Sequence, residues 1–164
     1  MGFSVMEMLV VVFVFAILGV ISTQILALSL RSSQKSASIG EVRANVNYAV
    51  DVMERLLRNA SELDVLTCNS SSIQYINEQG ESCYFECKDV GSESYIVSGC
   101  GTDPEVQLTS GKVRIDCSQV FSCTESPGVP PSVTITLAGE DAEFGVGTEG
   151  AGVTVQTQVQ LRTY

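Results

Sequence analysis

Residues 8–30 contain no charged side chain, and this run limits the possible folds more than any other feature of the sequence. A helix rises 1.5 Å per residue, so about 20 apolar residues can cross the hydrocarbon core of a bilayer. Glu7 lies at the start of the run, and a carboxylate in lipid costs roughly 2.5–3.5 kcal/mol. Such a residue usually has a partner and a function, although at the headgroup boundary it would simply stay hydrated.

Three residues stand at fixed offsets before the apolar run: Gly2, Phe3 and, five residues after the glycine, Glu7. This arrangement resembles the processing site of type IV pilins and of the pseudopilins of type II secretion. The resemblance implies that a prepilin peptidase cuts after Gly2 and methylates the new amino group of Phe3. It also implies that Glu7 lies near the N-terminal ammonium of a neighbouring subunit. The sequence is consistent with such a pairing, because a carboxylate in lipid needs a cation and no Lys or Arg precedes Arg31.

An amphipathic stripe continues the helical signal beyond the apolar run. Its apolar residues recur at alternating spacings of three and four, which is typical of a helix with one buried face. We therefore predict one helix from Ser4 to Leu63, roughly 90 Å long, whose first half lies in lipid or a filament core. The stripe also permits a coiled coil, but its alanines and the β-rich sequence that follows favour packing on a sheet. The stripe consists of Ile39, Val42, Val46, Ala49, Met53, Leu56, Ala60 and Leu63.

The remaining sequence alternates short β-type runs with turn residues, which predicts an antiparallel sheet. The fold class is therefore α+β and pilin-like, and the tract 53–60 and the strand order resemble minor pilins and pseudopilins of the W and J type. Residues 127–131 and 139–152 are predicted loops. The predicted strands are Ser72–Asn77, Ser82–Lys88, Ser94–Ser98, Glu105–Leu108, Lys112–Cys117, Ser132–Leu137 and Val153–Leu161.

Four parts follow from these patterns: a leader remnant at 1–2, a membrane or filament-core helix at 3–30, an amphipathic half at 31–64 and an extracytoplasmic head at 65–164. The net charge of −10 is concentrated in the head, where four basic residues face thirteen acidic ones. An acidic head repels phosphates, so we expect no binding to nucleic acid.

All six cysteines lie in the head, which indicates a disulfide framework in an oxidising compartment. Zinc is the alternative, but the chain has no histidine and no paired C-x₂-C. Six cysteines allow fifteen pairings; the predicted strand neighbours suggest Cys68–Cys87 and Cys83–Cys100, which leaves Cys117–Cys123 to close a short loop.

The topology signals conflict at one point. Arg31 and Lys35 would place the C-terminal side of the helix in the cytoplasm by the positive-inside rule. The cysteines and the processing site place it outside, and we follow these two. The residues before the expected cut lack the usual Lys or Arg, so we expect a leader that is short, trimmed or lost to a mistaken start codon.

The sequence offers little for catalysis. Without histidine neither a Ser-His-Asp nor a Cys-His arrangement exists, so we expect no enzyme and no cofactor. Residues 145–150 match G-x-G-x-x-G, but only fourteen residues follow and they alternate like a strand, so a dinucleotide site is rejected. The nearby acids are interpreted as a solvated loop, with calcium as an alternative and no metal assigned. They are Glu140, Asp141, Glu143 and Glu149.

The first functional hypothesis is a minor pilin or pseudopilin that assembles into a filament through its N-terminal helix. The resemblance implies as partners other pilin or pseudopilin subunits, the prepilin peptidase, the inner-membrane assembly machinery and, before assembly, membrane lipid. It implies a single-pass inner-membrane location first and a filament at the surface or in the periplasm later. The alternative is a membrane-anchored extracytoplasmic module that binds a ligand or mediates adhesion and does not polymerise.

Overall fold

The computed structural model describes residues 5–91, 93–126, 129–142 and 152–160. Its helix, α1, spans Val5–Arg58 without interruption. The chain forms two compact units, Met1–Ala37 and Ser38–Tyr164, and α1 contributes to both. In the first unit every described side chain, from residue 5 to residue 37, is exposed, because no other element of that unit covers the helix.

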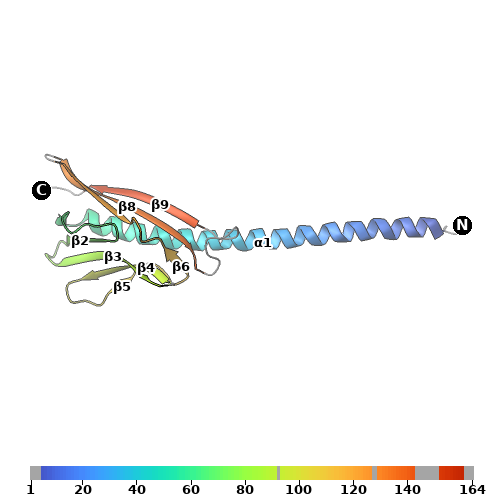
Figure 1. Cartoon of the computed structure of the whole chain (residues 1–164), viewed down its shortest axis with the longest axis horizontal. Helices are drawn as coiled ribbons and strands as arrows, with labels where there is room; N and C mark the ends of the chain where they lie inside the picture. The colour runs from blue at the N-terminus through green and yellow to red at the C-terminus, as the bar shows by residue number, and fades with distance from the viewer. Residues whose placement is uncertain (1–4, 92, 127–128, 143–151, 161–164) are drawn as a thin grey trace. The chain divides into compact units, whose positions relative to one another are not determined.

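In the second unit the remaining part of α1 packs on β-sheets. The predicted stripe is confirmed from Val42 to Met53, whereas Ile39 and Leu56 are only partly buried and Leu57 is buried in place of Leu56. The helix runs beside β8 and β9 (Figure 1), and the hydroxyl of Thr157 donates to the Glu54 carboxylate at 3.2 Å. A sheet therefore covers the stripe, as predicted. The buried residues of the helix are Val42, Val46, Ala49, Val50, Met53 and Leu57.

The helix ends at Arg58, five residues before the predicted end at Leu63. The last turn tightens, since the amide of Ala60 donates to Leu57 O at 3.2 Å. Ser61 then donates its amide to Ile76 O at 2.9 Å, and the chain continues as a strand beside residues 74–76. Leu63 stays buried in the strand, at 8% exposure. The apolar spacing was therefore compatible with both geometries, and strand pairing decided between them.

Two antiparallel sheets follow the helix. The first has the order β1-β2-β3-β4-β5. In the second, β8 pairs with each of the other three strands, β6, β7 and β9. The first sheet consists of β1 (Glu62–Asp64), β2 (Ser72–Ile76), β3 (Ser82–Val90), β4 (Glu93–Cys100) and β5 (Val106–Gln107). The second consists of β6 (Val113–Ile115), β7 (Phe121–Ser126), β8 (Val129–Asp141) and β9 (Gly152–Gln160).

All seven predicted strands exist, and β1 and β7 were not predicted: β1 has three residues and was assigned to the end of the helix, and β7 was not recognised as a strand. The predicted loop at 127–131 is wrong in its second half: β8 begins at Val129 and includes Pro130 and Pro131. Proline is tolerated at the first positions of a strand, where no ladder bond needs its amide. β8 also extends to Asp141, so the predicted loop at 139–152 begins later; residues 143–151 lie outside the described part.

One hydrophobic core joins the helix and both sheets. Within it the rings of Tyr75 and Phe85 stack with centroids 5.2 Å apart, and burial raises the pKa of the Tyr75 phenol, which therefore stays neutral. The antiparallel architecture on one long helix confirms the expected α+β fold.

Three disulfides close the second unit, and only Cys83–Cys100 agrees with the predicted pairing. The other two predicted pairs are wrong, because the structure joins Cys68 to Cys123 and Cys87 to Cys117. Cys87 points to the inner face of β3, where it meets the segment after β6 of the other sheet. The prediction considered neighbours within one sheet, whereas two bridges connect the two sheets.

Candidate functional site

The first candidate surface is the exposed apolar part of α1, residues 5–30. Two of its hydroxyls bond back to the helix: Ser22 Oγ donates to Leu18 O at 2.8 Å and Thr23 Oγ1 to Val20 O at 2.9 Å. Hydroxyls that bond back to the backbone can lie in lipid or in a dry helix interface. By length and composition α1 can cross a membrane, a test that a signal sequence also passes.

Glu7 lies in the first turn of α1 and is exposed. A carboxylate there is favoured by the partial positive charge at the N-terminus of the helix. Within the described ranges Glu7 forms no ion pair, and the nearest basic residue along the helix is Arg31. Gly2 and Phe3, the predicted processing residues, lie outside the described residues.

A second group of interacting side chains lies on the outer face of the first sheet. Lys88 Nζ donates to both carboxylate oxygens of Glu105, at 2.8 and 2.6 Å, and the Tyr84 hydroxyl donates at 2.6 Å. Hydrogen bonds from Lys88 and Tyr84 lower the pKa of the Glu105 carboxyl, and the bond to Glu105 raises that of Lys88. The Tyr84 ring lies over Gly99, which leaves it space. This cluster ties the segment before β5 to β3, and every charge in it is paired.

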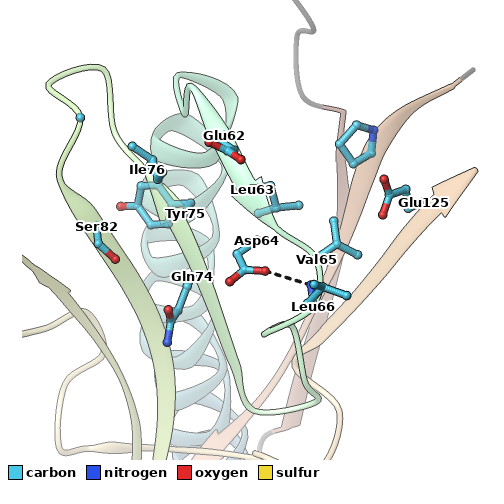
Figure 2. Close-up of a pocket in the computed structure, with 12 residues that line it drawn as sticks. Glu62, Leu63, Asp64, Val65, Leu66, Gln74, Tyr75, Ile76, Ser82 and Glu125 are labelled. Carbon is cyan, nitrogen blue, oxygen red and sulfur yellow. Dashed lines mark hydrogen bonds between the residues drawn. The ribbon is translucent and has the colours of Figure 1, made fainter.

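A groove of about 470 Å³ forms the third candidate, at the end of the second unit where α1 stops and β1 begins. Figure 2 shows its lining, with Val65 and Leu66 on the loop after β1 and Glu125 on β7 facing them. Asp64 Oδ1 accepts the amide of Leu66 at 3.1 Å, which fixes the loop. Glu62 and Asp64 stand two residues apart on β1 and are both exposed.

No ion pair in the described part of the chain uses a carboxylate of this groove. The lining contains three acidic residues and no Lys or Arg: Glu62, Asp64 and Glu125. The groove was not predicted from the sequence, because the helical spacing continues through residues 62 and 63 and indicated a helix there. The alternation of acidic and apolar residues from 62 to 64 is the signal that could have shown it.

The acids of the 139–152 region do not form a metal cluster among the described residues. Glu140 Oε1 lies 3.7 Å from Arg114 Nη1, and the Asp141 carboxylate accepts a hydrogen bond from the Ser38 hydroxyl. Each of these two carboxylates thus interacts with the protein itself. Glu143 and Glu149 lie outside the described residues.

No protein family model, curated protein sequence or solved structure matches this chain. The architecture alone is pilin-like: one long N-terminal apolar helix whose second part packs on antiparallel sheets. The apolar helix indicates a membrane anchor or a signal, and the three disulfides indicate an extracytoplasmic domain.

Proposed function

We propose that this protein is a minor pilin or pseudopilin. It is cleaved after Gly2, methylated on Phe3 and assembled into a filament through residues 5–30 of α1. In support, the apolar side chains of this segment point in all directions around the helix and none is buried. Such a surface needs an apolar surrounding on every side, which lipid supplies before assembly and neighbouring helices supply after it.

Glu7 is the observation that carries the proposal. A carboxylate among apolar helices is stable only beside a cation, yet the first basic residue, Arg31, lies 24 residues further, about 36 Å along the helix. No Lys or Arg of the same helix is near enough to supply the counter-charge, whereas cleavage after Gly2 would create an N-terminal ammonium that a neighbouring subunit can bring to Glu7 in a filament. Pairing between subunits would fix their register, since a shifted neighbour leaves both charges unpaired.

The proposed partners are other subunits of the filament, a prepilin peptidase and an inner-membrane assembly machine. The role is structural and not enzymatic, in keeping with a chain that has no histidine. The disulfides support exposure of the head outside the cytoplasm, where thiols oxidise.

Replacing Glu7 by glutamine tests the proposal, because the side chain keeps its size and loses its charge. We expect Glu7→Gln to remain in the membrane fraction with a folded head and to be absent from sheared filaments. Asp51→Asn is the matched control: it neutralises an exposed acid on the same helix and should assemble normally. Filaments that contain Glu7→Gln at the level of the wild type would refute the role of Glu7.

The processing step has its own test. Intact-mass analysis of the purified protein should give a chain that begins with methylated Phe3, and Gly2→Ala should retain the leader. A mature wild-type chain that begins with Met1 and stays monomeric would favour a membrane-anchored binding module. The unpaired carboxylates of the groove are the observation that favours this second function.

A further inference from the structure

The groove at the end of the second unit borders a free strand edge. β1 is the first strand in the sheet order, so β2 covers one of its edges and no described strand covers the other. Side chains alternate along β1: Leu63 is buried, while Glu62 and Asp64 both project away from the core. If another strand paired with the free edge of β1, every second residue of that strand would lie opposite one of these two carboxylates.

Apolar side chains line the groove beside the acids, together with the polar Gln74 and Ser82. Leu66 is 96% exposed, more than any other large hydrophobic residue of the described chain. It lies with Val65 between the end of the first sheet and Glu125 and Pro131 of the second. Partners are usually anchored by a few central apolar contacts with a polar rim around them. Leu66 is suited to be such a contact, with Glu62, Asp64 and Glu125 as the rim.

Charge identifies the occupant. Three carboxylates without a protein cation attract a basic segment and repel the acidic head of a second copy. The basic residues that precede the head in this chain, Arg31 to Arg58, lie on α1. A helix uses its backbone donors and acceptors internally and cannot extend a sheet. A basic segment of another protein therefore matches the charge of the groove better than a second copy does.

We propose that the groove binds an extended segment of another protein, which carries Lys or Arg at every second position and adds to the free edge of β1. The basic side chains pair with Glu62 and Asp64, and apolar residues between them cover Leu66. Backbone hydrogen bonds to β1 give affinity, and the alternating charges give register. The proposal goes beyond filament assembly, because it concerns residues that the assembly helix does not contain.

The test uses the full-length disulfide-bonded protein in a non-ionic detergent and three fluorescent hexapeptides followed by fluorescence anisotropy. The first peptide alternates Lys and Val, the second has the same composition in two blocks, and the third alternates Glu and Val. We expect the alternating basic peptide to bind with a Kd below about 1 mM, the block peptide at least about fivefold more weakly, and the acidic peptide not at all. N-methylation of the alternating basic peptide at every second amide should abolish binding, since it removes the donors for strand addition.

Paired variants locate the site. Glu62→Gln with Glu125→Gln should weaken binding of the alternating basic peptide about three- to tenfold, because it removes one proposed charge pair and one further carboxylate of the rim. Glu78→Gln with Glu93→Gln makes the same charge change at exposed positions outside the groove and should leave the Kd within about twofold of the wild type. Leu66→Ser should also weaken binding, and near-ultraviolet circular dichroism verifies that each variant is folded. Equal losses in both glutamine pairs, equal binding of alternating and block peptides, or no binding of the basic peptide would each overturn the proposal.

Discussion

Gly139 of β8 provides the sharpest test of how α1 docks on the sheets. A Cβ atom at this position would lie 2.6 Å from Val46 Cγ2, 3.2 Å from Val113 Cγ1 and 3.4 Å from Ile115 Cδ1. The first separation is too short for real contacts, so Gly139→Ala must displace Val46 or the helix that carries it. Gly139 has no positive φ, so alanine adds no backbone strain.

The expected loss follows from these distances. Overpacking a dense core lowers the stability of the folded state by about 1–3 kcal/mol. Replacing glycine by alanine also makes the unfolded chain less flexible, which raises stability by about 0.4–1 kcal/mol. We expect Gly139→Ala to lower the free energy of unfolding by about 1–2 kcal/mol. Urea unfolding of the full chain in non-ionic detergent, followed by tyrosine circular dichroism, measures this change.

Two further variants make the test specific. Gly111→Ala is the control, because nothing lies within 4 Å of its Cβ position and its φ is not positive. Its stability should stay within about 0.5 kcal/mol of the wild type or rise. Val46→Ala removes the clashing methyl group, so the double variant should be more stable than the sum of single losses by about 1 kcal/mol. Unchanged stability of Gly139→Ala, or strict additivity in the cycle, would refute the close approach of α1 to β8.

The disulfides and the Glu105 cluster yield two more predictions. Cys68→Ser with Cys123→Ser removes a disulfide between residues 55 apart in sequence and should lower the free energy of unfolding by about 4 kcal/mol. Cys83→Ser with Cys100→Ser removes a disulfide between residues 17 apart and should lower it by about 3 kcal/mol. Thermal unfolding ranks the pairs, and a Cys68–Cys87 peptide in a non-reduced digest would contradict the structure. The pKa of Glu105 is lowered on folding, so its contribution is present above the usual carboxyl pKa near 4.3 and is lost as the pH falls below it. The difference in Tm between the wild type and Glu105→Gln should therefore narrow as the pH falls below about 4.3, and a difference that does not change with pH would contradict the pairing with Lys88.

The helix was predictable because its signals are local. The apolar run of residues 8–30 and the stripe from Val42 to Met53 depend only on the 3.6-residue period, and both agree with α1. The six cysteines, all in the head, likewise indicated a disulfide-closed domain. Long alternating segments such as β9 could be placed to within about a residue for the same reason.

The sequence by itself thus determined the helix, the β-rich head and the isolated charge of Glu7, since each depends on neighbours along the chain. Only the tertiary structure decided where α1 ends, which cysteines pair and that Glu125 of β7 faces Glu62 and Asp64 of β1 across a groove. The end of α1 depends on the pairing of β1 with β2, and the other two features arise between the two sheets. The physical reason is that side chains far apart in sequence meet there, and no local spacing encodes which of them do.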